Sequence, residues 1–392
     1  MNFIKVKNKT DVVILSDLHP ELQLGGGGAI AYEFHNLLDD LGYSVQFWFT
    51  TSNKEFINKQ NENEIGIFSS NPRTRFGIKF REILGVGNLL KVLMLTLKFR
   101  PKVIWVHQIG NHWPYLLIPV LRFFQVKIIF TFHDYLVLSK YKIDPIDSSR
   151  NEVLGNVNVG TSNYQIFRRT LLRTMANSAN QTTAVSNLQK QILEEFQIRI
   201  DVVVPNGVAP CVHEIFLEND FPESISNLLF AGRLNRKGLD IMCDAVIQAK
   251  SGWILHLAGD NDLFDYCSMR LDSEKFKYHG KLSRFELGEL IHKMDLVGVC
   301  SQYYDPYPTV GLEALRHGSF FLSTNTAGIS HIYSSAVSEN LIFEIGKVPD
   351  LDSALNFIND NLDILDAVKN RLPTPMDTCK IYLEMIDELI SP

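Results

Sequence analysis

The stretch NLLFAGRLNRKGLD, residues 227–240, contains the pattern that decides the fold. Its apolar run is short and continuous, which is typical of a strand buried on both faces of a parallel sheet. A basic loop follows the run, and a helical pattern begins near Gly238. In α/β sheets, the residues directly after a strand lie at the edge where ligands bind. This stretch therefore predicts both a fold class and a candidate binding loop.

The same alternation of apolar runs and helical patterns extends along the chain in both directions. In the first half it predicts strands at 11–16, 44–49, 102–107, 127–132, 181–186 and 201–207, with helices near 29–41, 87–99, 114–124 and 163–178. In the second half it predicts strands at 227–233, 253–260, 276–280, 295–301 and 319–324, with helices at 238–249, at 283–293 and from about 309. Such alternation indicates an α/β protein with two doubly wound sheets.

The length agrees with two domains, because 392 residues exceed the size at which a single core usually splits. We place the first domain at 1–207 and the second at 208–375. The segment 208–227 has two prolines and no clear period, so it reads as a linker.

Charge and cysteine content exclude several classes of protein. A formal net charge of −6 argues against a nucleic-acid partner, although residues 1–205 carry 23 Lys and Arg against 17 Asp and Glu, and residues 206–392 carry 15 against 27. The cysteines are odd in number and lack CxxC spacing, which argues against a disulfide framework or a zinc site: Cys211, Cys243, Cys267, Cys300 and Cys379. No signal peptide or spanning segment is expected, so a cytoplasmic location fits best.

Two candidate site elements follow strands of the first half. Gly25, Gly26, Gly27 and Gly28 precede a helix, where bare backbone permits close approach and the helix N-terminus favours an anion. The alternative is a flexible loop. His133 ends the strand 127–132 with Asp134 beside it, and we expect it to point into the crevice between the domains. The alternative is a structural histidine.

Two further elements follow strands of the second half. Arg233 and Lys237 lie on the loop before a helix, which suits a pyrophosphate clamp, although an ordinary basic loop is the alternative. In YYDPYPTVGLEALRHG, residues 303–318, the prolines prevent a helix until Thr309. Free amides from there to Leu312 suit a phosphate, while carboxylates on either side could accept hydrogen bonds from sugar hydroxyls.

These motifs resemble the retaining GT4-type glycosyltransferases (glycosyl transferases group 1) of GT-B fold. AGRLNRKGLD, followed some seventy residues later by SQYYDPYPTVGLEAL, looks like the donor-site signature of that family. Other segments match in the same order: LSDLHPELQLGGGG, LGYSV, KVIWVH, FTFHD, TTAVS, VVVPNGV, LHLAGD and KYHGKLS. The resemblance runs from residue 11 to about 330.

The resemblance implies roles for individual residues. Arg233 and Lys237 would bind the donor diphosphate, Glu313 the ribose hydroxyls and Asp305 the hydroxyls of the donor sugar. His133 would lie by the reacting carbon, and Gly25 to Gly28 would border donor and acceptor. Backbone contacts would come from Tyr307, Pro308, Thr309, Val310 and Gly311. The sequence departs from the family at Asp305, where glutamate is usual.

The resemblance also implies an architecture and an activity. Two Rossmann-like domains would face each other across a cleft, the first taking the acceptor and the second the nucleotide-sugar donor. A helix within about 376–392 would cross back onto the first domain. The implied reaction is retaining and needs neither metal nor cofactor. It moves a sugar to a glycan or lipid-linked acceptor in polysaccharide or glycolipid biosynthesis.

Alternative interpretations remain open. A nucleotide-sugar 2-epimerase and a non-catalytic nucleotide-sugar-binding module share the fold. Asp260, Asn261 and Asp262 satisfy the DxD pattern of metal-dependent glycosyltransferases. The basic region 73–102 favours peripheral contact with an anionic membrane, at its inner face, over a solvated surface.

Overall fold

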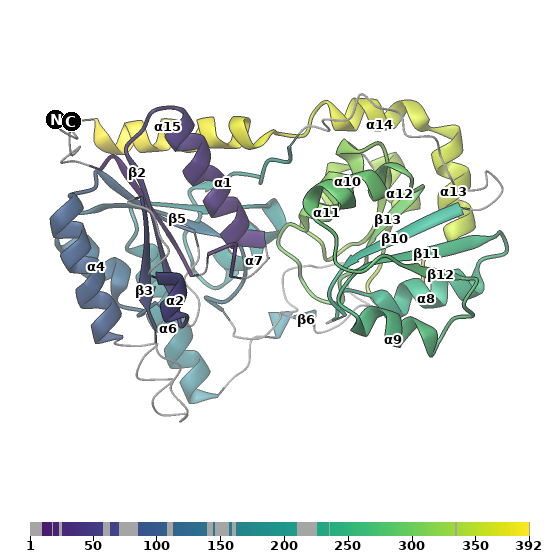
Figure 1. The fold of residues 1–392 in the computed structure, drawn as a ribbon, viewed down its shortest axis with the longest axis horizontal. Helices are drawn as coiled ribbons and strands as arrows, with labels where there is room; N and C mark the ends of the chain where they lie inside the picture. Colours follow the sequence, from purple (N-terminus) through teal and green to yellow (C-terminus); the bar gives the residue numbers. More distant parts are fainter. Residues whose placement is uncertain are drawn as a thin grey trace. The chain divides into compact units, whose positions relative to one another are not determined.

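A computed structural model describes residues 10–17, 19–22, 26–57, 63–69, 85–107, 113–138, 144–145, 157–158, 162–209, 226–234, 236–333 and 335–391. The chain forms two compact units (Figure 1). Unit 1 comprises Met1–Tyr141, Val159–Asn206 and Pro375–Pro392, and unit 2 comprises Lys142–Asn158 and Gly207–Thr374. Most of the expected linker, 208–227, lies outside the described residues.

One short segment lies in a different unit from the one that the sequence suggests. The paired strands β6 (Asp144–Pro145) and β7 (Val157–Asn158) belong to unit 2, whereas the sequence boundaries put them in the first domain. Which unit such a segment joins depends on tertiary contacts, and its sequence has no hydrophobic period that would indicate them.

Unit 1 is built on a parallel sheet whose described strands have the order β3-β2-β1-β4-β5-β8-β9. Their bounds are β1 Val12–Ser16, β2 Val45–Thr51, β3 Glu64–Phe68, β4 Val103–Val106, β5 Lys127–Phe132, β8 Gln181–Ala184 and β9 Val202–Val203. Every residue of β1, β2 and β4 is buried, which explains their continuous apolar runs. The strand order reverses between β1 and β4, because β2 lies on the other side of β1.

One face of this sheet packs against α1 (Gly26–Asp40) and the C-terminal helix α15 (Pro375–Ile390) (Figure 1). Tyr382 of α15 is buried, and its ring centroid lies 4.1 Å from that of Trp105. Its hydroxyl also lies within 3.2 Å of Thr131 Oγ1 and 3.0 Å of Thr183 Oγ1. Helix α15 is therefore part of the core of unit 1. This agrees with the expected helix within 376–392 that crosses back onto the first domain.

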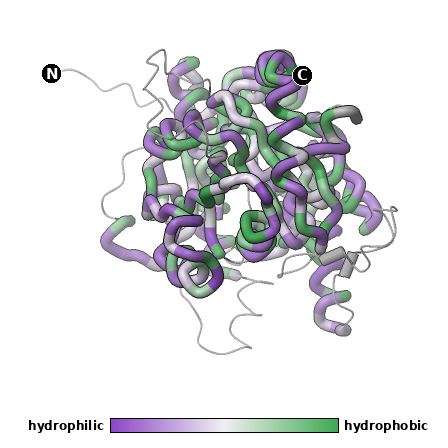
Figure 2. The backbone as a smooth tube through the Cα atoms, turned by 90° about the vertical axis from the view of Figure 1, so that its right-hand side faces the viewer, coloured by the Kyte–Doolittle hydropathy of each residue, from purple (hydrophilic) through white to green (hydrophobic). Residues whose placement is uncertain are grey.

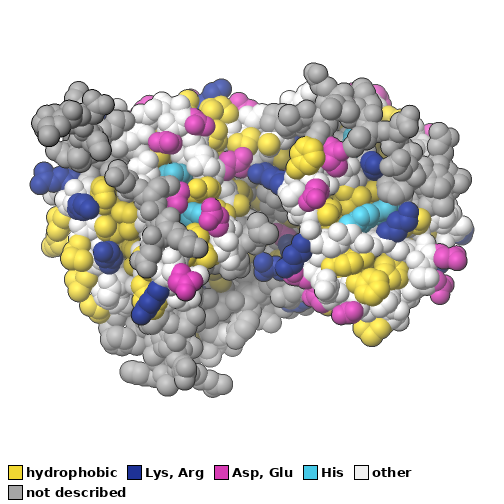
Figure 3. Space-filling model, viewed as in Figure 1, with side chains coloured by type: hydrophobic (Ala, Val, Ile, Leu, Met, Phe, Trp, Pro, Cys, Tyr) yellow, Lys and Arg dark blue, Asp and Glu magenta, His cyan; other side chains and the backbone are white. Residues whose placement is uncertain are grey.

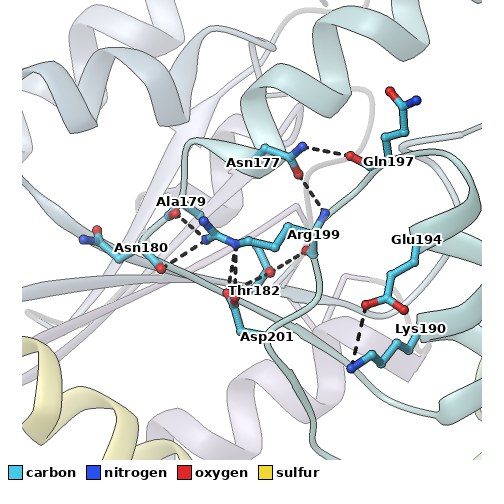
Figure 4. A network of polar contacts seen from close by, with 9 residues as sticks. All are labelled: Asn177, Ala179, Asn180, Thr182, Lys190, Glu194, Gln197, Arg199 and Asp201. Atoms are coloured by element: carbon cyan, nitrogen blue, oxygen red, sulfur yellow. Dashed lines mark hydrogen bonds and ion pairs between the residues drawn. The ribbon is translucent and has the colours of Figure 1, made fainter.

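Among the described residues, unit 1 also contains the helices α2 (Lys54–Ile57), α4 (Val86–Phe99), α5 (Leu117–Phe123), α6 (Asn163–Asn177) and α7 (Asn187–Glu195). The end of α6 is fixed to the edge strands by a polar network (Figure 4). Arg199 bonds the carbonyls of Ala179 and Asn180, while Asp201 accepts from Arg199 and Thr182. These contacts satisfy backbone groups between neighbouring strands, which is a structural role.

Unit 2 repeats this architecture with the strand order β12-β11-β10-β13-β14-β15. The strand bounds are β10 Ser226–Gly232, β11 Trp253–Gly259, β12 Phe276–Tyr278, β13 Leu296–Val299, β14 Phe320–Thr324 and β15 Ile342–Phe343. The helices are α8 Leu239–Gln248, α9 Asp262–Ser268, α10 Arg284–His292, α11 Thr309–Arg316, η1 Ser330–Ile332, α12 Ser335–Leu341, α13 Leu351–Asp360 and α14 Leu362–Lys369. Along the helices, green and purple residues alternate in Figure 2, as expected for amphipathic elements.

Two glycines let the central strand ends of unit 2 approach each other. Gly238 has φ +84°, and a Cβ there would lie 2.0 Å from the carbonyl oxygen of Cys300. Gly259 has φ +154°, and a Cβ there would lie 2.2 Å from the carbonyl oxygen of Gly232. Both positions therefore exclude side chains.

Within the described residues, no helix is long and apolar enough to cross a bilayer.

A buried histidine lies in the middle of the unit 2 sheet. His256 on β11 is fully buried, and its Nε2 lies 3.0 Å from Asn227 Oδ1. Since a carbonyl oxygen only accepts, Nε2 carries the proton and Nδ1 accepts from His279 Nε2 at 2.9 Å. Burial, His279 and Lys277 lower the pKa of His256 to about 3. The neutral ring is therefore the form that the fold holds.

We expect Tyr382→Ala to lower the free energy of unfolding of unit 1 by about 3–5 kcal/mol, because it removes a fully buried aromatic side chain. Urea unfolding followed by tryptophan fluorescence measures this, since Trp105 contacts Tyr382. The matched control is Ile381→Ala on the same helix, where 38% of the side chain is exposed and the loss should be much smaller. Equal losses would show that α15 is not a core element.

We expect unit 2 to lose stability in acid because of His256. Its folded pKa of about 3 lies below the unfolded value of about 6.5, so the unfolded chain takes up the proton first as the pH falls. The contribution is complete above pH ~6.5 and declines by roughly 3–6 kcal/mol towards pH ~3. As the pH is lowered, the measured free energy of unfolding should fall less steeply in His256→Gln than in the wild type. An unchanged slope in His256→Gln would contradict the assignment.

Candidate functional site

The candidate site of unit 2 lies at the carboxyl edge of its sheet, where the strand order reverses between β10 and β13. The chain leaves β10 through residues 233–238 and leaves β13 through residues 300–308. Because both strands are parallel neighbours, these two loops meet at the same edge. Crevices at such a reversal are the usual ligand sites of open α/β sheets.

The two loops are joined by an ion pair between Lys237 and Asp305. Lys237 Nζ lies 2.5 Å from Asp305 Oδ2, although the residues are 68 positions apart in the chain. Ser301 Oγ donates to the same carboxylate oxygen at 2.9 Å, and the Tyr303 hydroxyl lies 3.5 Å from it. The structure thus brings together two of the residues that the sequence analysis selected, and it adds Ser301.

Charge and burial define the chemistry of this pair. Burial alone would lower the pKa of Lys237, but the Asp305 carboxylate outweighs it and holds that pKa above its usual value. Asp305 is 7% exposed, whereas 36% of the Lys237 side chain is exposed. An ammonium has three N–H donors, so Lys237 can serve Asp305 and still meet an anion. Asp305 acts here as the group that orients a permanent cation.

The backbone around Asp305 is also fixed. Its N–H donates to Thr326 O at 3.1 Å, and its carbonyl accepts from Gly328 N at 2.8 Å. On the other loop, Arg236 exchanges hydrogen bonds with the backbone of Gln302, at 3.0 Å and 2.7 Å. The two loops therefore form one rigid edge.

Arg233 lies at the exposed side of this edge, directly after β10. Lys281 donates to Asp260 at 2.6 Å, and this hydrogen bond has the largest effect in lowering the pKa of that carboxyl. The charge of Arg233 contributes to the same shift. Arg233, Asp260 and Lys281, which follow the neighbouring strands β10, β11 and β12, thus interact electrostatically with one another. Arg233, the second cation of the expected clamp, therefore lies on the same loop as Lys237.

The helix α11 begins at Thr309 after Pro308, which serves as its N-cap without a side-chain hydrogen bond. Tyr307 and Gly311 are buried, and Thr309 and Val310 are partly exposed. A Cβ at Gly311 would lie 2.4 Å from Ile329 Cδ1 and 3.2 Å from Phe321 Cγ. Gly311 therefore permits α11 to pack on the sheet, and the backbone contact that the resemblance implies for it stays a prediction.

Glu313 lies one turn inside α11, where 17% of its side chain is exposed. Arg284 Nη2, from the first residue of α10, lies 3.8 Å from Glu313 Oε1. The carboxylate is thus on the surface side of the helix, one turn from the uncapped amides.

The DxD tripeptide has other contacts in the structure. Asp260 pairs with Lys281, Asn261 Oδ1 accepts from the Tyr278 hydroxyl at 2.7 Å, and Asp262 begins α9. Among the described residues, no group of three His, Cys, Asp or Glu side chains is placed to hold a metal ion.

The candidate residues of unit 1 also flank a strand-order reversal, between β1 and β4. Helix α1 begins at Gly26, so Gly26, Gly27 and Gly28 form its first turn, earlier than the expected start near residue 29. A Cβ at Gly27 would lie 2.9 Å from His133 Cβ. Packing thus explains this glycine and places it against His133. Gly25 lies outside the described residues.

His133 is paired with a second histidine. His107 follows β4 as His133 follows β5, and His107 Nδ1 lies 3.0 Å from His133 Nε2 with the rings stacked. Burial lowers the pKa of His133 to about 4, and burial with His133 lowers that of His107 well below its usual value. Both rings are therefore neutral, with one proton shared across the contact.

Asp134, the next residue in the chain, accepts with its Oδ1 from Leu136 N at 2.9 Å and so forms a local turn. The sequence analysis missed His107, although its position after a strand is the same signal that selected His133. A cavity of about 10 Å³, the size of a water molecule, lies against His107, His133 and Asp134.

Both halves of the chain match known families of protein sequences. Residues 24–210 match the family described as Glycosyltransferase Family 4, and residues 226–361 match Glycosyl transferases group 1. No curated protein matches the chain.

Solved structures with the same fold cover nearly the whole chain. A sucrose-phosphate synthase from Thermosynechococcus elongatus has a TM-score of 0.71 at 14% identity, covering 97% of this chain and 99% of that one. Anabaena HepE, solved with UDP and glucose, has 0.67 at 14%, covering 97% and 100%. A lipopolysaccharide outer core galactosyltransferase has 0.68 at 14%, covering 97% and 99%. With both halves matched to these families and two Rossmann-like units of this architecture, the chain belongs to the GT4-type glycosyltransferases (glycosyl transferases group 1) of GT-B fold.

Proposed function

We propose that this glycosyltransferase moves a sugar from a nucleotide diphosphate sugar to a glycan or lipid-linked acceptor, with retention of the anomeric configuration. Unit 2 binds the donor and unit 1 the acceptor. The reaction needs no metal ion and no cofactor, and its product belongs to polysaccharide or glycolipid biosynthesis.

The observation that carries this proposal is the cationic edge of unit 2. Lys237 is held by Asp305, Arg233 is exposed on the same loop, and α11 presents an N-terminus without a side-chain cap. Cations and the N-terminus of a helix suit a diphosphate. The crystal structure of HepE contains UDP and glucose, and another similar structure is a lipopolysaccharide galactosyltransferase, which supports these classes of donor and acceptor.

The cations act in the bond-breaking step. The bond from the anomeric carbon to the diphosphate oxygen breaks and negative charge builds on the diphosphate. The acceptor hydroxyl oxygen bonds to the same face of that carbon, which retains the configuration, and its proton passes to an oxygen of the departing diphosphate. Arg233, Lys237 and the amides of residues 309–312 stabilise this charge more in the transition state than in the ground state. Because these groups are fixed before the reaction, little reorganisation is needed. Asp305 contributes by holding Lys237, and its remaining carboxylate oxygen can accept from a donor-sugar hydroxyl.

Roles for the other candidates follow from their positions. Glu313 binds the ribose hydroxyls one turn from the amides. His133 lies at the reacting sugar, with His107 fixing its ring, and the first turn of α1 borders the substrates. These assignments rest on the resemblance together with the local geometry of each unit.

A thermal-shift screen of nucleotide diphosphates and their sugars tests the donor class, because a ligand of the native state raises its stability.

We expect Glu313→Gln to weaken nucleotide binding by about 10–100-fold, since a charge-assisted hydrogen bond is worth about 1.5–3 kcal/mol. The control is Glu339→Gln, an exposed acid on α12. Unchanged affinity in folded Glu313→Gln would remove this residue from the site.

Product analysis separates the proposed activity from its alternatives. Turnover that requires an acceptor and persists in EDTA supports a metal-independent transferase. Conversion of the donor alone would indicate an epimerase, binding without any turnover would indicate a non-catalytic module, and activity restored by Mn²⁺ after EDTA would indicate a metal site.

We expect Arg233→Ala to lower kcat by about 10²–10³, the usual loss of one electrostatic stabiliser, with a smaller effect on ground-state binding. Arg233→Lys should restore only part of the rate, because an ammonium lacks the planar fork that grips two phosphate oxygens. The matched control is Lys250→Ala, an exposed cation just before β11 and so at the opposite edge of the sheet. A fully active Arg233→Ala would defeat the mechanism.

A further inference from the structure

Two cysteines of unit 2 lie in contact. Cys243 on α8 and Cys267 on α9 are both fully buried, and their Sγ atoms lie 3.6 Å apart. Both are free thiols. The sequence analysis argued against a disulfide framework from the odd number and the spacing of the cysteines, and 24 positions separate these two in the chain. Their contact is therefore a product of the tertiary structure.

The two sulfur atoms are close enough to bond after a small movement. A disulfide has an S–S distance of about 2.05 Å, so the Sγ atoms need to approach each other by about 1.5 Å. Rotation about χ1 can supply part of this movement. The same two segments are also joined nearby, since Arg270 Nη2 lies 2.6 Å from Asp244 Oδ1. The fold thus holds both thiols at one junction between α8 and the end of α9.

The surroundings make Cys267 the more acidic of the two thiols. The hydrogen bond from Cys243 has the largest effect in lowering the pKa of Cys267, and the charge of Arg270 acts in the same direction against the opposing effect of burial. The hydrogen bond and burial raise the pKa of Cys243. Because the thiolate is the form that attacks an oxidant, Cys267 supplies the nucleophile and Cys243 the second thiol.

The end of α9 gives a small oxidant a route to Cys267. Residues 268–270, directly after Cys267, are exposed. Exposed fractions of 44% for Phe264 and 78% for Met269 show that α9 is a surface helix. Figure 3 shows hydrophobic side chains at the surface in this part of unit 2, at the lower right of the view. Opening of the last turn of α9 is therefore enough to expose the thiolate.

The other described cysteines differ from this pair. Burial raises the pKa of Cys379 to about 11, and burial is the largest cause of the raised pKa of Cys300. Both are therefore thiols at neutral pH and react slowly. Cys211 lies outside the described residues.

We propose that Cys243 and Cys267 form a reversible disulfide when hydrogen peroxide reaches them, so that the pair is a redox modification site of unit 2. In a reducing compartment the pair rests as two thiols, and the bond forms only under oxidant. The proposal is independent of the transferase activity, since the bond needs neither donor nor acceptor.

The chemistry balances with peroxide as the oxidant. The Cys267 thiolate attacks one peroxide oxygen, the O–O bond breaks, and the leaving hydroxide takes up the proton that the thiol had released. The product is a sulfenic acid and one water. Cys243 then passes its proton to the sulfenic hydroxyl and attacks the Cys267 sulfur, so that the S–S bond forms, the S–O bond breaks and a second water leaves. Two thiols lose two electrons, which the peroxide gains.

The first experiment treats the full folded chain with a small excess of hydrogen peroxide. Remaining thiols are then alkylated under denaturing conditions, and cysteine pairs are mapped by mass spectrometry without reduction. We expect a peptide pair that joins Cys243 to Cys267 and that dithiothreitol separates.

Single substitutions assign the two roles. Cys243→Ala should stop the reaction at the sulfenic acid of Cys267, which dimedone labels, whereas Cys267→Ala should remove both the bond and the label. The matched control is Cys300→Ala, another buried cysteine of unit 2, which should form the bond like the wild type. Circular dichroism should show all variants folded, and the mapping of the wild type decides the proposal if one is not.

A second experiment measures the effect of the bond on stability. A disulfide restricts the unfolded chain, so peroxide treatment should raise the thermal unfolding midpoint of unit 2 by about 5–10 °C. The midpoint of Cys243→Ala should not rise with peroxide. A bond without a rise would mean that closure strains unit 2, and would overturn the inference that the fold holds these thiols ready to bond.

Three further results would overturn the proposal. Two thiols that both remain open to alkylation after peroxide would mean that the pair is an inert contact of the core. A bond from Cys211 to either residue would assign the site to a different pair. Oxidation of Cys300 and Cys379 as fast as that of Cys267 would mean that the reaction is not selective.

Discussion

The parallel pairing of β10 with β13 is the constraint on which the candidate site of unit 2 depends. It brings the loop after β10 against the loop after β13, and Gly238 permits this approach because any side chain there would meet the Cys300 carbonyl. The ion pair of Lys237 with Asp305 then fixes the cation at the edge of the sheet. Without that pairing, Lys237 and Asp305, which are 68 residues apart in the chain, would not lie in contact.

Unit 1 follows the same rule with different chemistry. Its strand order also reverses, between β1 and β4, and the residues gathered there are a glycine and two neutral histidines. Gly27 leaves room for His133, and His107 holds the ring from the next strand. The reversal in strand order thus gathers a lysine–aspartate pair in unit 2 and a pair of neutral histidines in unit 1.

These features lower stability in isolation, which is why we associate them with function. A partly buried ion pair loses hydration that its attraction repays only with good geometry, and neutral buried histidines favour unfolding in acid. Proteins retain such departures from local rules mainly at sites that bind or react.

The sequence by itself determined the class of fold, because continuous apolar runs alternating with helical patterns allow few arrangements other than parallel α/β sheets. It also located the loops around Arg233, Asp305 and His133, since each follows a buried strand. It did not determine the partners of these residues. His107 contacts the ring of His133, Gly311 permits α11 to pack on the sheet, α1 begins at Gly26, and the strands β6 and β7 join unit 2. Each depends on contacts between segments far apart in the chain, whereas periodicity and turn chemistry report only on neighbours in sequence. Tertiary structure alone could therefore decide which side chains meet at the strand ends.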